Sequence, residues 1–446
     1  MYKPRHKPVL YLERLLAHLR TPLYQNGYAL LLSGAATSGL GLVYWVLAAR
    51  YYSPETLGVN SAALSAMLFL SGISQLSLNG VLVRFTPVAG RATKWLVIYS
   101  YLISLSAALV ASCGFILGIE IWSPTLRFLN TNRLLLVLFV LATMVWCIFA
   151  LQDSVMTGLR QAMWVPIENT LFSIAKIGLL IAFANVLQHY GIFASWTIPV
   201  ALSLVPINLL IFRRLIPKHV EETPVEPSPH MRRQIIRFVG GNYLGTLFFL
   251  TSTTLLPIMV ADQAGPRANA YFYQPWMITS ALQLVAVNMT TSLTVEATRD
   301  RSKLSTYCFH VFMHTLRLLV PLVLVILLGA PYILQIFGRD YAAEGAGLMR
   351  LLALATIPNS VVLIYLSAVR VQNHIGRVVL VQGALCVLAL GLSYLLLQRF
   401  HIVGIGLAWL MSQTVVAVVL ILTQLRPILR HVRIAYMAQR GEKLAS

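Results

Sequence analysis

The sequence predicts an all-α polytopic membrane protein with about twelve transmembrane helices. Only 11% of the 446 residues are charged and 58% are hydrophobic, whereas about 25% of the residues of a soluble domain are charged. The mean hydropathy is +0.75, and apolar stretches of about 20 residues, long enough to cross the hydrocarbon core, recur along the whole chain. Water cannot be the main solvent of this protein.

The individual spans follow from these apolar windows, inside which Gly, Ser and Thr recur as they do where helices pack closely in lipid. The windows are 28–48, 60–85, 95–119, 134–157, 166–187, 192–212, 238–261, 270–295, 307–329, 345–369, 377–397 and 403–423.

The segment before the first window, 1–27, is basic and has no short apolar core with a small-residue cleavage site, so it does not read as a cleaved signal peptide. Leu12, Leu15, Leu16 and Leu19 fall on one helical face, which predicts a basic amphipathic helix on the inner leaflet. A disordered tail is the alternative. A second basic segment, 425–446, ends the chain.

The basic residues are distributed unequally between the two sides of the membrane. With a cytoplasmic N terminus, the inner connections and the tail hold Arg91, Lys94, Arg160, Arg213, Arg214, Lys218, Arg232, Arg233, Arg237, Arg299, Arg301, Lys303, Arg370, Arg377, Arg426, Arg430, Arg433, Arg440 and Lys443. The outer side keeps Arg50, Arg127, Arg133, Arg267, Arg339 and Arg399. The positive-inside rule therefore places both termini in the cytoplasm of a cell whose inner membrane holds the protein. The net charge of +20 then predicts anionic phospholipids as partners, and not nucleic acid.

The chain divides at its longest connection, 213–237, which contains the Pro- and Glu-rich stretch HVEETPVEPSPH and is typical of a flexible linker. It separates a first set of six spans, 28–212, from a second, 238–424. Aligning the two sets places Ala49 over Ala261 and Pro54 over Pro266. This weak repeat predicts two halves of the same orientation with a substrate path between them.

Several blocks of the sequence resemble the polysaccharide flippases, or O-antigen-type translocases, of the multidrug, oligosaccharidyl-lipid and polysaccharide exporter superfamily. The blocks are LAARYYSPETLG, SLNGVLVRFTP, LQDSVMTGLRQAMWVPIENTLFSIAKI, NAYFYQPWMITSALQLVAVNMTTSLTVEA and APYILQIFGRDYAAEGAGLMRLLALATIP. The resemblance implies two six-helix bundles around a central cavity lined by spans one, two, seven and eight. It also implies a polyprenyl-pyrophosphate-linked oligosaccharide as cargo, carried outward by alternating access for cell-surface polysaccharide or lipopolysaccharide biosynthesis. A polysaccharide polymerase and glycosyltransferases are then further candidate partners.

Span nine carries the clearest group of ionisable residues. Tyr307, His310, His314, Arg317 and Pro321 share one helical face. Arg317 is the candidate for the pyrophosphate because a guanidinium offers forked donors to phosphate oxygens, although an arginine snorkelling to the inner surface is the alternative. The histidines have i, i+4 spacing, but no nearby acid or cysteine completes a metal site, so neither a metal nor a cofactor is predicted.

Further candidates lie deep in other spans, where a charge costs at least about 2.5 kcal/mol. Lys176 and Asp153 are close enough in depth for a structural ion pair, and a transport role is the alternative for both. Asp153 is the candidate for binding a coupling ion, Arg350 near the outer end of span ten is a further cavity candidate, and Glu168 is expected near the surface.

Span two has a small and polar face, formed by Ser61, Ser65, Gly72, Gln75 and Asn79 at intervals of about 3.5 residues. Such a face suits sugar hydroxyls and suits helix packing equally. Gln75 and Asn79 are therefore cavity candidates.

The aligned halves also place residues of opposite charge at matching positions. Arg84 lies over Glu296 at the inner ends of spans two and eight, and Arg50 lies over Asp262 at the outer ends of spans one and seven. We hypothesise that each pair closes one gate; ordinary end-of-helix charges are the alternative.

The same features weigh against three other functions. A cation-coupled multidrug exporter of the same superfamily would bury acids, whereas the deep charges here are mainly basic. A membrane glycan polymerase or ligase needs a large outer loop, and the outer loops here are short. A scaffold or receptor would not need ionisable residues, Pro and Gly within its spans.

Overall fold

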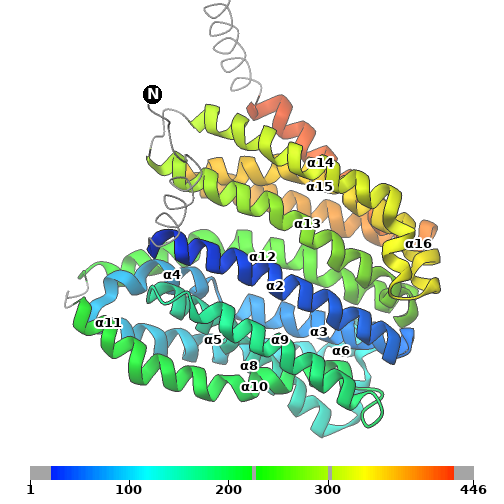
Figure 1. Cartoon of the computed structure of the whole chain (residues 1–446), viewed down its shortest axis with the longest axis horizontal. Helices are drawn as coiled ribbons and strands as arrows, with labels where there is room; N and C mark the ends of the chain where they lie inside the picture. The colour runs from blue at the N-terminus through cyan, green and yellow to red at the C-terminus, as the bar shows by residue number, and fades with distance from the viewer. Residues whose placement is uncertain (1–21, 224–227, 300–303, 426–446) are drawn as a thin grey trace, which may run out of the picture.

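A computed structural model describes residues 22–223, 228–299 and 304–425, and the description excludes the side chains of 22–36, 291–299, 305 and 424–425. Helices account for all regular structure in these ranges (Figure 1). The predicted segments 1–27 and 425–446 lie almost wholly outside the described residues. The long helices are α2 (Pro22–Tyr51), α3 (Pro54–Ser74), α4 (Leu78–Ala89), α5 (Thr93–Leu117), α8 (Arg133–Gly158), α9 (Trp164–Phe183), α10 (Gly191–Leu210), α12 (Met231–Ala264), α13 (Pro266–Arg299), α14 (Leu304–Gln335), α15 (Arg339–Val371) and α16 (Ile375–Leu420). Shorter elements include α6 (Ile119–Trp122), η2 (Pro124–Leu126), α7 (Phe128–Thr131) and α11 (Ile216–Glu222).

The predicted spans correspond to these helices. Nine helical stretches of the described residues are long and apolar enough to cross a membrane. Helices α2 and α13 match the first and eighth predicted windows, and α16 covers the last two. Non-helical backbone at Phe400 and at His401, whose φ is 50°, divides α16 into two helices. The predicted all-α class with about twelve spans is confirmed.

The second predicted span is two helices instead of one. Leu76 and Ser77 have φ values of 49° and 60°, a left-handed conformation that costs a residue with a side chain about 1–2 kcal/mol. The break separates α3 from α4, so Ser61 and Asn79 do not share the continuous helical face that the spacing predicted. Gln75 caps the end of α3, and Asn79 lies in the first turn of α4.

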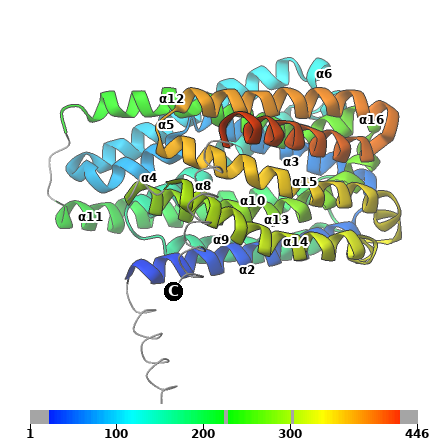
Figure 2. The same cartoon turned by 90° about the horizontal axis from the view of Figure 1, so that it is seen from above.

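The described residues before 224, called the first half, pack against those after 227, called the second half, mainly through α3, which contacts both α12 and α13. In Figure 1 the first half occupies the lower part of the molecule, and in Figure 2 helices α2 and α14 lie on the same face. The aligned prolines each open a helix, Pro54 that of α3 and Pro266 that of α13. We call the end of the molecule that holds these two turns the Arg267 end.

The hydrophobic core is shared by the two halves at one end of the molecule and divided into separate clusters at the other. Toward the Arg267 end, one cluster joins the halves and includes Leu64 and Met67 of α3 with Leu256 and Phe272 of the second half. Toward the opposite end, the buried residues form separate clusters, one built from α4, α5 and α8 and another from α15 and α16. The halves therefore share a core at one end only, and at the other they meet chiefly through the first turns of α12.

The predicted linker is partly helical. Helix α11 ends at Glu222 and α12 begins at Met231, so the connection between the two helices is shorter than the predicted linker, 213–237. The division into two six-helix domains stays a prediction.

Candidate functional site

The halves approach most closely where α3 meets the start of α13. A Cβ atom added to Gly58 would lie 1.7 Å from the carbonyl oxygen of Pro266, which is far inside van der Waals contact. Asn269, which is fully buried, donates from Nδ2 to the Gly58 carbonyl at 2.8 Å and to Ser61 Oγ at 3.1 Å. Glycine at position 58 thus lets two backbones touch and be joined by hydrogen bonds.

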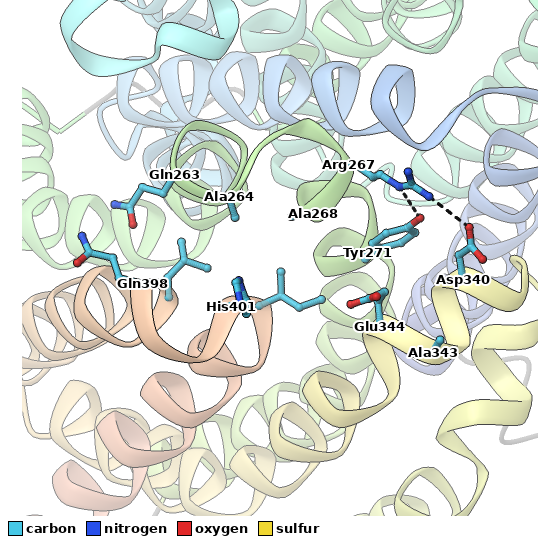
Figure 3. Close-up of a pocket in the computed structure, with 12 residues that line it drawn as sticks. Gln263, Ala264, Arg267, Ala268, Tyr271, Asp340, Ala343, Glu344, Gln398 and His401 are labelled. Carbon is cyan, nitrogen blue, oxygen red and sulfur yellow. Dashed lines mark hydrogen bonds and ion pairs between the residues drawn. The ribbon is translucent and has the colours of Figure 1, made fainter.

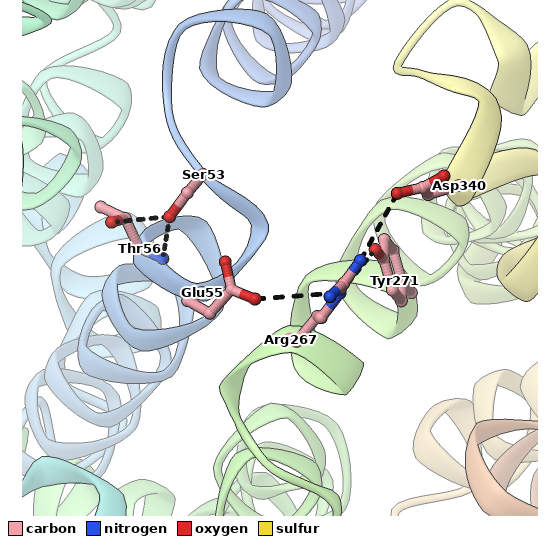
Figure 4. A network of polar contacts seen from close by, with 6 residues as sticks. All are labelled: Ser53, Glu55, Thr56, Arg267, Tyr271 and Asp340. Atoms are coloured by element: carbon pink, nitrogen blue, oxygen red, sulfur yellow. Dashed lines mark hydrogen bonds and ion pairs between the residues drawn. The ribbon is translucent and has the colours of Figure 1, made fainter.

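Arg267 joins three helices at the same end (Figure 4). Its Nε lies 3.8 Å from a carboxylate oxygen of Glu55 on α3, and its Nη2 lies 3.5 Å from Asp340 on α15. Nε also donates to the Tyr271 hydroxyl at 3.0 Å. The three charged side chains are about 60% exposed, and an exposed ion pair contributes at most about 1 kcal/mol. The network links the halves but can be broken at low cost.

The predicted pairing of Arg50 with Asp262 is wrong in this conformation. Arg50 donates from Nη2 to the Ile336 carbonyl at 2.8 Å, which joins α2 to the end of α14. Asp262 accepts from the Thr125 amide at 2.8 Å and from Ser123 Oγ at 3.2 Å. Each residue joins the halves separately, because the carbonyls at the end of α14 and the donors around η2 are nearer than the opposite charge.

A cavity of about 710 Å³ also opens at the Arg267 end (Figure 3). It lies wholly within the second half, between the α12–α13 turn, the start of α15 and the kink of α16. Arg267, Tyr271, Asp340, Glu344 and His401 line it. Its lining holds both acids and bases.

A different set of residues lines two cavities toward the opposite end. One, of about 500 Å³, lies among α12, α13, α15 and α16, and its polar lining includes Gln283, Asn359, Gln382 and Gln413. The other, of about 220 Å³, lies where α4 of the first half meets α12, and Asn79 lines it. Both include Gly245, Thr246 and Arg370. The structure therefore places the predicted Asn79 beside a cavity. It also places Arg370 there, which the sequence suggests is a loop charge because it ends an apolar run.

Lys176 lies in the interior of the first half, only 6% exposed. Its ammonium is 4.4 Å from the ring centre of Trp196 on α10, 5.0 Å from Phe172 and 5.1 Å from Tyr44 on α2. Because aromatic faces attract cations, the three rings replace an acidic partner. The predicted ion pair with Asp153 is wrong, since Lys176 makes no ion pair within the described residues.

Asp153 belongs instead to a polar cluster that also holds Glu168. Asn169 donates to Asp153 Oδ2 at 3.2 Å, Gln152 donates to Glu168 Oε1, and Asn208 donates to Gln152 at 3.1 Å. Glu168 is only 3% exposed, so the expectation of a solvated position is wrong. The turn after α8 folds α9 back, so that neighbouring residues at the ends of both helices meet.

The predicted face of span nine is present but exposed. His310, His314 and Arg317 are exposed on α14, whose packed side contacts α13 and α15, and they are not among the lining residues of the cavities above. Arg350 donates from Nε to the Leu327 carbonyl at 2.9 Å and so links α15 to α14. The transport roles of these residues stay predictions.

The side chain of Glu296, the predicted inner partner of Arg84, lies outside the described residues. Arg84 places its guanidinium carbon 5.4 Å from the ring centre of Phe238 on α12 and 5.7 Å from that of Phe85. It therefore contacts the second half through an aromatic ring.

The fold and the cavities define a polytopic membrane protein in which two helical halves pack at one end and hold polar cavities, as in transporters. The chain belongs to the family described as polysaccharide biosynthesis protein, whose model matches residues 23–295.

Solved structures of two kinds share this fold. An inward-facing multidrug resistance MATE family transporter of the MOP superfamily is similar over 88% of this chain and 94% of its own, with 14% identity and a TM-score of 0.68. The lipid II flippase MurJ, in an inward closed conformation, is similar over 90% and 87%, with 10% identity and a TM-score of 0.69. At these identities the likeness concerns the fold. No curated protein matches the sequence.

Proposed function

We propose that this protein is a flippase that moves a polyprenyl-pyrophosphate-linked oligosaccharide from the cytoplasmic to the outer leaflet for cell-surface polysaccharide biosynthesis. Membership of the polysaccharide biosynthesis family supports a glycan cargo. The lipid II flippase, whose name states a lipid-linked substrate, has the same fold. The multidrug transporters share that fold too, but the family match favours the glycan.

The observation that carries this proposal is the difference between the two ends of the molecule. One core and the Arg267 network join the halves at one end, where the cavity is confined to the second half, whereas separate cores and two polar cavities occupy the other, one of them between α4 and α12. The excess of basic residues at the second end orients it toward the cytoplasm. The structure then corresponds to a state that is closed outside and receives its cargo from inside.

Transport requires the closed end to open in turn. At the closed end, Arg267 joins the halves through exposed ion pairs. Each such pair contributes little to the stability of the closed state and can break and re-form in each transport cycle. Moving a pyrophosphate outward also carries negative charge down an inside-negative potential, worth about 2.3 kcal/mol per charge per 100 mV. The potential thus favours export, and Asp153 is the candidate for any coupled cation.

The proposal includes the location of the protein. The positive-inside pattern favours an inner membrane with both termini in the cytoplasm. Anionic phospholipids contact the basic inner surface, and the glycosyltransferases and polymerase of the same glycan act before and after the transport step.

Depletion of the protein in its host tests the proposed function. We expect a lipid-linked oligosaccharide to accumulate in the cytoplasmic leaflet, out of reach of a membrane-impermeant lectin in intact cells and accessible in inverted vesicles. Unchanged lipid-linked pools together with increased sensitivity to cationic drugs would contradict the proposal and favour a multidrug exporter.

A further inference from the structure

Among the described residues that line the two cavities at the end opposite Arg267, Arg370 is the only charged one. It lies in the last turn of α15, at the place the two cavities share. Within the described residues its guanidinium has no hydrogen-bond or ion-pair partner. Arg267, by contrast, is held by Glu55 and Asp340. An unpaired guanidinium in a cavity is a site for an anion.

The described residues that line the cavity beside Arg370 include buried amides and no acid. Asn359, Gln382 and Gln413 are 7%, 6% and 4% exposed and come from α15 and α16. The Oε1 atom of Gln413 has no hydrogen-bond partner among the described residues, although a buried polar group without a partner costs about 1–3 kcal/mol. Each amide offers both donors and acceptors, which is the combination that neighbouring sugar hydroxyls require.

The residues that line this cavity lie at different depths along their helices. Asn359 lies about 16 Å deeper than Arg370, at a rise of 1.5 Å per residue. Trp409, 4% exposed, lines the same cavity and offers an apolar surface for a sugar ring. A volume of about 500 Å³ is in the range of small-molecule sites, so it suits a head group and not a polyprenyl chain.

We propose that this cavity is the head-group site, in which Arg370 binds the diphosphate and the amides of Asn359, Gln382 and Gln413 bind the first sugars. This inference rests on the proposed function, and it specifies where the cargo binds. In the proposed orientation Arg370 lies at the cytoplasmic end of its span, which is the depth of a lipid diphosphate in the inner leaflet. The amides lie deeper, so the glycan enters the protein ahead of its lipid.

Binding of farnesyl diphosphate to the purified full-length protein tests the anion part, with farnesol as the probe that lacks the diphosphate. We expect Arg370→Gln to weaken farnesyl diphosphate binding at least tenfold and to leave farnesol binding within twofold. Arg370→Lys should keep part of the affinity. Arg377→Gln is the matched control, because it removes the same charge from an exposed residue of the same end outside the cavity linings.

Wild-type affinity in Arg370→Gln would overturn the proposal, and so would an equal loss of affinity for both probes in Arg370→Gln and Arg370→Lys, because Arg370 would then not recognise the diphosphate. Equal affinity of the wild-type protein for the two probes would also overturn it.

The proposed binding of the first sugars is tested with the lipid-linked oligosaccharide extracted from cells depleted of the protein. Gln413→Leu and Gln382→Leu should weaken its binding at least fivefold and leave farnesyl diphosphate binding unchanged. Unchanged binding of the glycan-bearing lipid would contradict this assignment. If depleted cells accumulate no such lipid, the proposed function fails, while the farnesyl diphosphate measurement still decides whether Arg370 binds a diphosphate.

Discussion

The Nε atom of Arg267 lies 3.8 Å from the carboxylate of Glu55, so that the first turn of α13 is tied to the first turn of α3 across the boundary between the halves. The same guanidinium reaches Asp340 at 3.5 Å. Both pairs are exposed, and each therefore contributes at most about 1 kcal/mol to keeping this end closed. A contribution of this size is suited to a contact that must break during transport.

Arg267→Gln should therefore raise the population open at the Arg267 end about 5- to 30-fold, since it removes both ion pairs and about 1–2 kcal/mol changes a two-state population by that factor. The measurement is the labelling rate of Ser61→Cys, introduced into a cysteine-free background, by a membrane-impermeant thiol reagent. Ser61 is fully buried at this junction. Arg339→Gln is the control, an exposed arginine at the same end outside the network. Equal labelling rates in the two variants would refute a gating role for Arg267.

Gly58→Ala should prevent the closed junction from forming. The added methyl group would lie 1.7 Å from the Pro266 carbonyl oxygen, a backbone atom that cannot rotate away, and overpacking of this kind costs about 1–3 kcal/mol. We expect transport to fall at least tenfold. Gly178→Ala is the matched control, because a Cβ atom there has nothing within 4 Å. Wild-type transport by Gly58→Ala would show that the halves need not approach this closely.

Lys176 and Trp196 should be energetically coupled. The ammonium lies 4.4 Å from the Trp196 ring centre, and a desolvated cation–π contact is worth about 2 kcal/mol. A double-mutant cycle with Lys176→Met and Trp196→Leu, read by thermal unfolding in detergent, should give a coupling energy between about 0.5 and 2 kcal/mol. Repeating the cycle with Trp146 in place of Trp196 is the control, because the ammonium does not lie over that ring. Additive effects of Lys176→Met and Trp196→Leu would contradict the cation–π contact.

Features of the structure that depend on local sequence could be predicted, whereas features that depend on tertiary packing could not. The helices follow from local signals, and Pro54 and Pro266 open α3 and α13 at the aligned positions, but the break at Leu76 and Ser77 between α3 and α4 does not. The depth of a residue along its helix could also be predicted, because it depends only on residue spacing. The contacts between side chains of different helices could not be predicted, since they depend on the rotation of each helix about its own axis.

Lys176 and Asp153 illustrate this limit. Their depths allow an ion pair, yet Lys176 faces three aromatic rings while Asp153 faces Asn169. Glu168 was misjudged for a related reason. Its position near the start of α9 suggests a solvated carboxylate, but α8 and α10 cover it and Gln152 donates to it.

The buried carboxylates of Asp153 and Glu168 lead to a last prediction. Neither forms an ion pair in the part of the chain that the structure describes, so the near-isosteric changes Asp153→Asn and Glu168→Gln leave no cation unpaired. Ionising a buried carboxyl without a cationic partner costs several kcal/mol of desolvation, and an amide side chain never carries that charge. We expect thermal stability in detergent to be retained or raised in both variants.

Transport by the same variants tests whether Asp153 binds a coupling cation. Proteoliposomes loaded with the lipid-linked oligosaccharide can be given a membrane potential alone, or together with a Na⁺ or pH gradient. If Asp153 couples transport to a cation, Asp153→Asn should lose the gradient-dependent part of the rate and keep the part driven by the potential, because the basic cargo site is untouched. A gradient response equal to that of the wild-type protein would show that the carboxylate serves only to bind Asn169 and hold α8 against α9.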